Sequence, residues 1–205
     1  YEISTRDWSS DVCSSDLASD AADSARRMRA MIDDVVRVLR DEQGMDAFEV
    51  PMDEILAEAA RRARLQAPEA SGLAWKVHPV VGPALGNRSA SLALLILENL
   101  CVNAVQALGG KGTVTLGALH EPGASRWIVT VEDDGPGIPE ASHAGLFLPM
   151  SSSKRGGSGL GLALSRQIAR HLGGDLSLDV SGPGGTRFRL AIPCDMAVRA
   201  ASMAD

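Results

Sequence analysis

Hydrophobic residues first recur with helical spacing between residues 23 and 43, where apolar positions repeat in a 4-3-4 pattern. They are Met28, Ile32, Val35 and Leu39. This spacing predicts one narrow stripe on a helix, of the width found in a coiled-coil or bundle seam. Gly44 follows as a C-cap. The stripe has nothing within the segment to pack against, so we expect a partner helix.

Three further helices are predicted in the rest of the chain. One is opened by Pro51 and carries acids in its first turn and arginines near its end, charges that suit the helix dipole. The next is capped by Asn87 or Ser89, runs to about Leu108, and is apolar on nearly all sides, which indicates burial. The last is read from SGLGLALSRQIARHLGG and stops at Gly173.

Strand-forming runs separated by turn signals predict the remaining elements. One strand is read from GLAWKVHP, and a pair from GTVTLGAL and RWIVTVE, joined by a turn that contains Pro122 and Gly123. DLSLDVSGPGGTRFRLAIP predicts a closing hairpin. Residues 138–157 are rich in glycine, serine and proline and predict a long loop, and residues 195–205 a frayed tail.

Composition and charge narrow the possible classes of protein. Hydrophobic residues make up 45% of the 205 positions, and no apolar run approaches the roughly 20 residues that a membrane span needs. The net charge of −6 argues against a nucleic-acid partner. Cys13, Cys101 and Cys194 are too widely spaced for a disulfide framework or a metal cluster. We expect a cytoplasmic piece that makes no membrane contact, although its parent protein can be membrane-anchored.

Residues 1–17 show neither a helical nor a strand period. Within them, DWSSDVCSSDL resembles the translation of a common high-throughput sequencing adapter, and YEI matches the upstream end of that adapter. The alternative is a natural disordered tail. We expect a non-native, adapter-derived segment that takes no part in the fold, and a parent protein whose own N-terminus is missing.

Polar residues in the apolar helix give the first sign of a site. Asn99 and Asn103 lie four residues apart and therefore on one face. Burying a side-chain amide costs about 1–3 kcal/mol unless it is hydrogen-bonded. Either a polar ligand lies on this face or the two amides bond to nearby loop backbone, and this helix alone leaves both readings open.

Three glycine-containing stretches add further candidates. SSSKRGGSGLGLAL places glycines at a helix start beside Lys154 and Arg155, an anion site that matches neither a Rossmann nor a Walker pattern. In EDDGPGIPE, Asp133 at a strand end can accept from an amino group of a flat ring that approaches the glycine backbone, leaving Asp134 or Glu132 facing solvent. In GPGGTRF, Thr186 could reach the same ring through a water.

Together these motifs resemble the ATP-binding domain shared by gyrase, heat-shock chaperones of the ninety-kilodalton class, mismatch-repair ATPases and sensor histidine kinases. ENLCVNAVQAL resembles the histidine-kinase N box, VEDDGPGIP the first glycine box, LFLPMSSSK the F box, and GGSGLGLALSRQIARHLGG the second glycine box. RMRAMIDDVVRVLRDEQG resembles the second helix of the dimerisation and phosphotransfer hairpin. The nitrogen-regulation type is the most similar subgroup, and the resemblance covers residues 23–193.

The resemblance implies an α+β fold, a two-layer sandwich with a mixed sheet of about five strands and three helices. The nucleotide would lie between the helix at 89–108 and the loop at 138–157. The implied domains are a partial hairpin at 18–45 and an ATP-binding catalytic domain at 50–194.

The resemblance also implies a role for each motif residue. Asn103 would hold the Mg²⁺ that bridges the phosphates of ATP, and Asn99 would help to place the γ-phosphate. Asp133 would accept from the adenine amino group, supported by Thr186. Gly135 and Gly137 would admit the ring, and Gly159 and Gly161 would receive phosphate oxygens. Gly157 and Leu160 would also contact the nucleotide. Lys154 would neutralise phosphate charge as a catalytic lysine, and Phe147 would anchor the loop at 138–157, the lid of the site.

The implied function is transfer of the γ-phosphate to a histidine for relay to the receiver domain of a response regulator, within a homodimer formed through the hairpin. None of the four histidines has the setting of a phosphoacceptor, since only His120 precedes an acid and it lies at a strand end. We therefore expect a fragment that cannot label itself. Two alternatives are an anti-sigma-factor-like serine kinase, which needs no helix at 23–43, and a non-catalytic nucleotide-sensing module.

Overall fold

A computed structural model describes residues 29, 33, 36, 48–66, 72–149 and 160–194. Its main sheet has five strands in the order β2-β4-β5-β7-β6. The strands are β2 (Gly72–Val77), β4 (Lys111–Glu121), β5 (Arg126–Asp133), β6 (Asp175–Gly182) and β7 (Gly185–Pro193). β2 runs parallel to β4, and the other neighbouring pairs are antiparallel.

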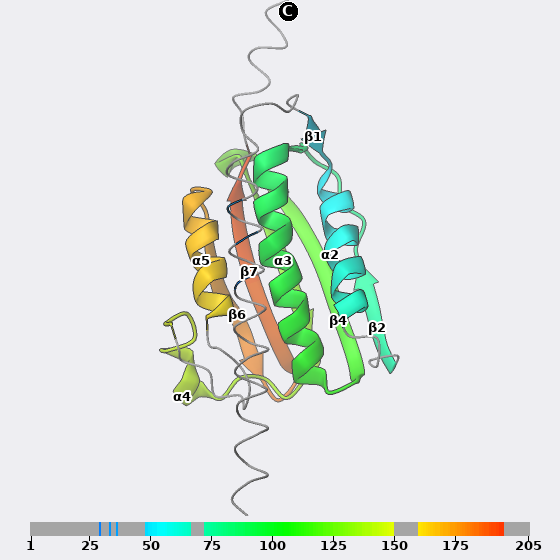
Figure 1. Cartoon of the computed structure of the whole chain (residues 1–205). Helices are drawn as coiled ribbons and strands as arrows, with labels where there is room; N and C mark the ends of the chain where they lie inside the picture. The colour runs from blue at the N-terminus through cyan, green and yellow to red at the C-terminus, as the bar shows by residue number, and fades with distance from the viewer. Residues whose placement is uncertain are drawn as a thin grey trace, which may run out of the picture.

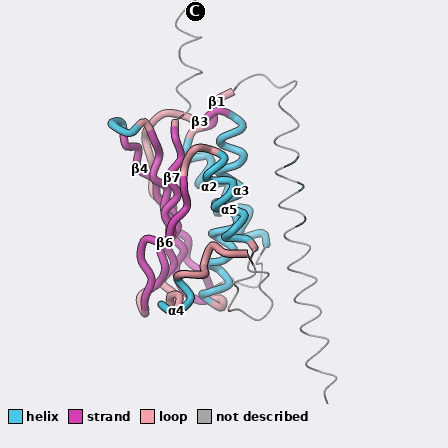
Figure 2. Tube along the Cα trace, turned by 90° about the vertical axis from the view of Figure 1, so that its left-hand side faces the viewer, coloured by secondary structure: helices cyan, strands magenta, loops and turns pink. Residues whose placement is uncertain are grey.

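Three helices cover one face of this sheet, as Figures 1 and 2 show. They are α2 (Met52–Gln66), α3 (Asn87–Leu108) and α5 (Gly161–His171). The core lies between the two layers, where α3 packs against α2, α5 and the sheet. The predicted two-layer α+β sandwich with five mixed strands and three helices is therefore confirmed.

The central helix α3 is apolar because it is enclosed. By length and composition it could cross a membrane, so the expectation that no apolar run is long enough was wrong. Half of its most apolar stretch is nevertheless buried inside the fold, as in the core helix of a soluble domain. Cys101 of α3 is fully buried, and this burial raises the pKa of its thiol to about 12.

Several element boundaries differ from the sequence prediction. α3 begins at Asn87, but its N-cap is Gly86 and no side chain caps it, so the prediction that Asn87 or Ser89 caps the helix was wrong. The predicted loop at 138–157 contains a short helix, α4 (Glu140–His143). Two-residue strands β1 (Glu49–Val50) and β3 (Leu85–Gly86) pair outside the main sheet and were not predicted. A 3-10 turn, η2 (Pro122–Ala124), links β4 and β5.

The topology brings four chain segments to one end of the molecule. α3 ends there, β5 ends there, and both α5 and β7 begin there, at the lower end in Figure 1. The chain between β5 and α4 crosses the same end. Those predicted site residues that the structure describes belong to these segments.

Candidate functional site

One face of α3 runs between two other parts of the proposed site. Asn99, Asn103 and Ala107 follow one another at intervals of four residues and therefore line one face. At the upstream end of this row, the Asn99 Nδ2 donates to the Oγ of Ser165 in α5 at 2.9 Å. At the downstream end, a Cβ built on Gly135 would lie 3.8 Å from the Ala107 Cβ. Asn103 thus lies between the start of α5 and the glycine loop after β5.

The donor set of this face suits a hard cation shared with a phosphate ligand. The Asn103 side chain is half-buried and has no hydrogen-bond partner among the described residues. No group of three or more His, Cys, Asp or Glu residues in the described ranges could hold a metal by itself. Mg²⁺ commonly takes one or two protein oxygens and completes its shell with water and substrate phosphates. Asn103 fits that pattern through its amide oxygen.

Asp133 and Thr186 face each other across two strands. The last residue of β5, Asp133, is register partner of Thr186 near the start of β7. Asp133 is only 5% exposed and Thr186 4%. The amide N–H of Gly135 donates to the Asp133 Oδ1 at 3.0 Å. Asp133 and Thr186 therefore lie side by side at the strand ends, with the carboxylate held by its own following turn.

The glycine loop after β5 packs against the β6–β7 turn. Gly137 has φ +78°, and a Cβ there would lie 2.2 Å from the Gly182 carbonyl oxygen. The next amide, of Ile138, donates to the Ser181 Oγ at 2.7 Å. Only glycine meets both the dihedral and the contact at position 137. Its local packing is therefore sufficient reason for glycine, whatever space it also leaves for a ligand.

The two other acids of the EDD run are at least partly exposed to solvent, as expected, and each also has a partner on a neighbouring strand. Glu132 accepts from Arg187 on the neighbouring strand at 2.8 Å. The Asp134 Oδ1 accepts from the backbone N–H of Thr113 at 2.7 Å, and this hydrogen bond holds the pKa of Asp134 below its usual value. Both carboxylates therefore bind neighbouring strands rather than a ligand.

Replacing Asp134 with asparagine is expected to lower the stability by less than about 1 kcal/mol, because the carboxylate is exposed. The pKa of Asp134 is lowered in the folded state, so its contribution is present above the unfolded pKa of about 4 and is lost as the pH falls through the folded pKa. The stability difference between wild type and variant should thus be full at pH 7 and shrink toward pH 3. Urea unfolding at both pH values checks this, and a difference that grows toward pH 3 would contradict it.

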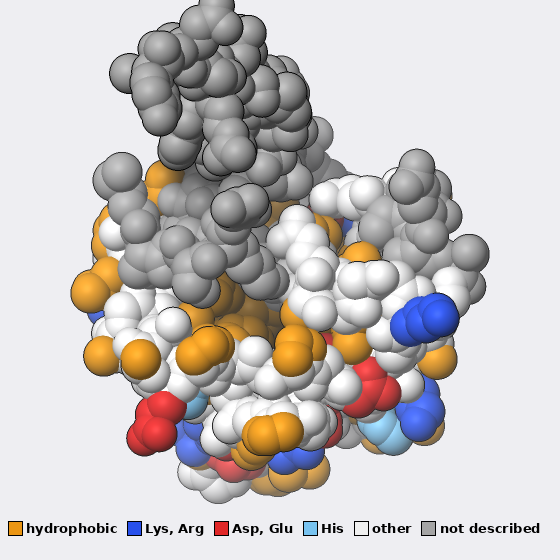
Figure 3. Space-filling model, turned by 90° about the horizontal axis from the view of Figure 1, so that it is seen from below, with side chains coloured by type: hydrophobic (Ala, Val, Ile, Leu, Met, Phe, Trp, Pro, Cys, Tyr) orange, Lys and Arg blue, Asp and Glu red, His pale blue; other side chains and the backbone are white. Residues whose placement is uncertain are grey.

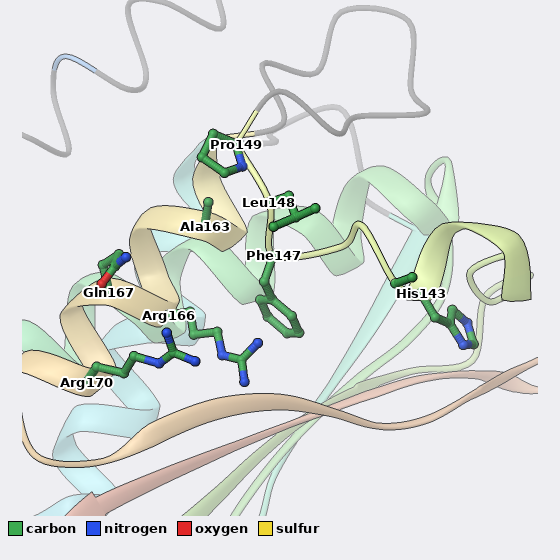
Figure 4. A pocket seen from close by; sticks show the side chains of 9 residues that line it. His143, Phe147, Leu148, Pro149, Ala163, Arg166, Gln167 and Arg170 are labelled. Carbon is green, nitrogen blue, oxygen red and sulfur yellow. The ribbon is translucent and has the colours of Figure 1, made fainter.

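Phe147 is anchored between the helical layer and the sheet. Its ring lies edge-on to Phe188 of β7, with centroids 6.4 Å apart, and under the guanidinium of Arg166, 4.7 Å from the ring centroid. Arg166 also donates to Asp175 at 3.0 and 3.2 Å, which lowers the pKa of that carboxyl. Figure 4 shows Phe147 and Arg166 directed toward each other beside a hollow of about 350 Å³ between α5 and residues 143–149. This geometry suits the predicted anchoring role.

Part of the glycine-rich segment lies outside the described residues. Lys154, Gly157 and Gly159 are therefore outside the described residues. Most of the helix predicted at 18–45 is outside them as well. Leu160 is the N-cap residue of α5, and Gly161 is its first helical residue. Figure 3 views this end of the molecule and shows a depression with hydrophobic side chains on its floor.

The four histidines all lie in described parts of the chain. His78 follows β2 and is exposed, and the ring of His120 packs 5.4 Å from that of Trp127. The His143 Nε2 is 2.9 Å from the Ile138 carbonyl oxygen, and the His171 Nε2 is 3.0 Å from Arg88 at the end of α5. None is placed on the asparagine face of α3.

One residue of the site was missed. Ser165 is fully buried and holds the carboxamide of Asn99, but a serine within an amphipathic helix has no unusual sequence signature. The sequence signal that could have found it is its position four residues after Gly161, on the face that also carries the last glycine of the glycine-rich motif.

Comparison with known proteins gives matches over the same region. The profile of the family "Histidine kinase-, DNA gyrase B-, and HSP90-like ATPase" matches residues 89–196, more than half of the chain. The C4-dicarboxylate transport sensor protein DctB of Rhizobium meliloti is 41% identical over 105 residues, 51% of this chain and 16% of that protein. The sensory histidine kinase/phosphatase NtrB of Rhodobacter capsulatus is 36% identical over 126 residues, 56% of this chain and 35% of that protein.

A longer match extends over most of the chain. The sensor histidine kinase ZraS of Klebsiella oxytoca is 30% identical over 180 residues, 86% of this chain and 38% of that protein. This chain therefore spans 16 to 38% of the length of these three relatives.

Solved structures show the same fold. Full-length ShkA in complex with AMPPNP aligns with a TM-score of 0.63 at 24% identity, over 82% of this chain and 36% of that one. The mycobacterial sensor histidine kinase MprB aligns with a TM-score of 0.59 at 24% identity, over 73% of this chain and 98% of that one. The chain belongs to the histidine kinase-, DNA gyrase B- and HSP90-like ATPase family, and it contains an ATPase domain of the kind found in sensor histidine kinases.

Proposed function

We propose that this chain binds MgATP at the lower end of the sandwich and, in its parent protein, transfers the γ-phosphate to a histidine. The observation that carries the proposal is the row of asparagines on α3. It links the N-terminus of α5 to the buried Asp133 at the end of β5. A ligand with an anionic end and an aromatic end has complementary groups at the two ends of this row.

Each end of the row has the chemistry that its part of ATP requires. The Asp133 carboxylate would accept from the adenine amino group, with the Thr186 hydroxyl beside it. The first N–H groups of a helix have no partner within it, and those at the start of α5 would receive phosphate oxygens. Bound Mg²⁺, held by the Asn103 amide oxygen, would neutralise phosphate charge. Lys154 would add a positive charge to the lid.

The proposed reaction moves the γ-phosphoryl group of ATP to an imidazole nitrogen supplied by a dimerisation hairpin, and ADP is the leaving group. The protein's contribution to such a transfer is mostly positioning and charge stabilisation. A response regulator would then receive the phosphoryl group in the cytoplasm, and the hairpin would make the homodimer. Within this chain the proposed domains are the partial hairpin at 18–45 and the catalytic domain at 50–194.

Replacing Asn103 with aspartate is expected to lower MgATP affinity about tenfold. The new carboxylate would repel the phosphates and alter the ligand shell of the metal. Preference for ATP over GTP should stay unchanged, since Asn103 lies away from Asp133. Calorimetric titration with ATP, ADP and GTP measures both effects. Gln106→Glu, on an exposed position of α3, makes the same amide-to-acid change and serves as control. Equal losses in the two variants would remove Asn103 from its proposed role.

Incubation with γ-labelled ATP tests the reaction class. We expect this chain to bind ATP without labelling itself, because its four histidines lie away from the asparagine row of α3. Adding an intact hairpin from a histidine kinase should give an alkali-stable, acid-labile label on that hairpin. An acid-stable phosphoserine on a partner would favour the serine-kinase alternative, and ATP binding without any transfer would favour a nucleotide-sensing module. Label on this chain alone would contradict the expectation.

A further inference from the structure

Ser165 occupies an unusual place for a polar side chain. It is fully buried within α5, on the side of that helix that meets α3. Its Oγ accepts a hydrogen bond from the Asn99 Nδ2 at 2.9 Å. Serine is a poorer helix former than alanine, and burying a hydroxyl costs free energy unless it is bonded. The contact with Asn99 compensates that cost at this position.

Gly161 fixes the other side of the same carboxamide. A Cβ built on Gly161 would lie 2.7 Å from the Asn99 Oδ1 and 3.3 Å from its Nδ2. Gly161 and Ser165 are four residues apart and so share one face of α5. The Asn99 carboxamide therefore lies between a glycine that leaves room for it and a hydroxyl that binds its nitrogen. Its rotation is restricted from both sides.

We propose that Ser165 is a positioning residue that sets the orientation of the Asn99 carboxamide for the γ-phosphate end of ATP. This inference rests on the function proposed above and extends it to a residue in the helix that follows the glycine-rich segment. With one N–H of the amide bound to Ser165, the carbonyl oxygen is turned toward Gly161 in the first turn of α5. An amide oxygen at this position can bind a cation or an ordered water, and either can in turn bind the terminal phosphate.

The same hydrogen bond joins two parts of the site that are far apart in sequence. Asn99 belongs to the asparagine row of α3, and Ser165 lies 66 residues later, one turn inside α5. Figure 1 shows the two helices side by side and antiparallel. This hydrogen bond, the tie between α3 and α5, keeps the first turn of α5 at a fixed distance from Asn103. Phosphate oxygens would bind at that first turn. Losing the tie should therefore affect the terminal phosphate more than the adenine ring.

The test compares ATP with ADP in Ser165→Ala. Both nucleotides have the adenine and two phosphates, so their affinity ratio isolates the terminal phosphate. We expect the preference for ATP over ADP in the presence of Mg²⁺ to fall about two- to tenfold, the worth of one hydrogen bond. Affinity for ADP should stay near that of wild type. A general loss of structure would weaken both nucleotides alike and would not change the ratio.

Three more variants make the result decisive. Asn99→Ala should lower the ratio at least as far, and the double variant should lower it no further than Asn99→Ala alone, because the two residues act through one group. Ser177→Ala removes a serine hydroxyl that donates only to the Arg189 carbonyl oxygen in the sheet and should leave the ratio unchanged. The side-chain amide resonance of Asn99 in NMR spectra, followed without nucleotide, should move in Ser165→Ala and stay in place in Ser177→Ala.

The outcomes separate the two proposals. Wild type that binds neither nucleotide would overturn the proposed function, and this inference would fall with it. Wild type that prefers ATP, together with an unchanged ratio in Ser165→Ala, would overturn only the positioning role. An Asn99 resonance that does not respond to Ser165→Ala would contradict the tie itself.

Discussion

Replacing Asp133 with asparagine is expected to lower ATP affinity roughly 10- to 100-fold and to abolish the preference for ATP over GTP. A carboxylate can accept hydrogen bonds at both oxygens, and the Oδ1 of Asp133 accepts from the Gly135 N–H. A hydrogen bond to a charged group is worth about 1.5–3 kcal/mol, which gives the expected range. Asparagine presents an NH₂ group, which repels the adenine amino group but can donate to the carbonyl oxygen of guanine.

The neighbouring acid gives a matched control for this prediction. Asp134→Asn makes the same chemical change one residue later, where the side chain binds the Thr113 N–H instead. Its nucleotide affinities should equal those of wild type. Calorimetric titrations of both variants with ATP and GTP measure the effect. Retained preference for ATP in Asp133→Asn would show that another group reads the base.

Replacing Gly185 with alanine is expected to destabilise the fold by about 2 to 6 kcal/mol. Gly185 has φ +126°, a conformation that costs a residue with a side chain about 1–3 kcal/mol. The added Cβ would also lie 1.9 Å from the backbone oxygen of Asp133, so β5 and β7 would have to separate. Overpacking of this kind costs a further 1–3 kcal/mol or so. The destabilisation would be concentrated in the pairing of β5 with β7, the strands that carry Asp133 and Thr186.

The residue before it provides the control. A Cβ on Gly184 would have no atom within 4 Å, and its φ is not in the left-handed range. Gly184→Ala should change stability by less than about 0.5 kcal/mol. Urea unfolding of both variants gives the comparison. If the two variants unfolded at similar concentrations, the β5–β7 contact would be more yielding than its geometry indicates.

The sequence predicted the elements whose signals are local. The uniformly apolar α3 was recognisable from its composition, and its paired asparagines marked the one polar face. The strand ending at Asp133 was recognisable because a β-branched run meets acids, glycines and prolines. These features arise from the periodicity and conformational preferences of short segments, which single sequences record well.

Other features depend on partners far away in the chain. The pairing of β2 with β4 in parallel requires α3 to cross between them, and no local pattern specifies that strand order. Asp134 binds an amide 21 residues earlier, and Ser165 a carboxamide 66 residues earlier. The strands β1 and β3 have two residues each, too few to show a period. Only the assembled fold reveals such contacts.

The buried thiol of Cys101 can serve as a chemical probe of local opening of the core. Alkylating reagents attack the thiolate, and a pKa of about 12 leaves almost none of it at neutral pH while α3 stays packed. The rate at which Cys101 is alkylated should therefore report how often the helical layer separates from the sheet. A nucleotide that binds only the closed form should slow this modification by the factor 1 + [L]/Kd. Alkylation of this thiol, measured with and without nucleotide, can thus give both the dissociation constant of the ligand and the opening equilibrium of the core.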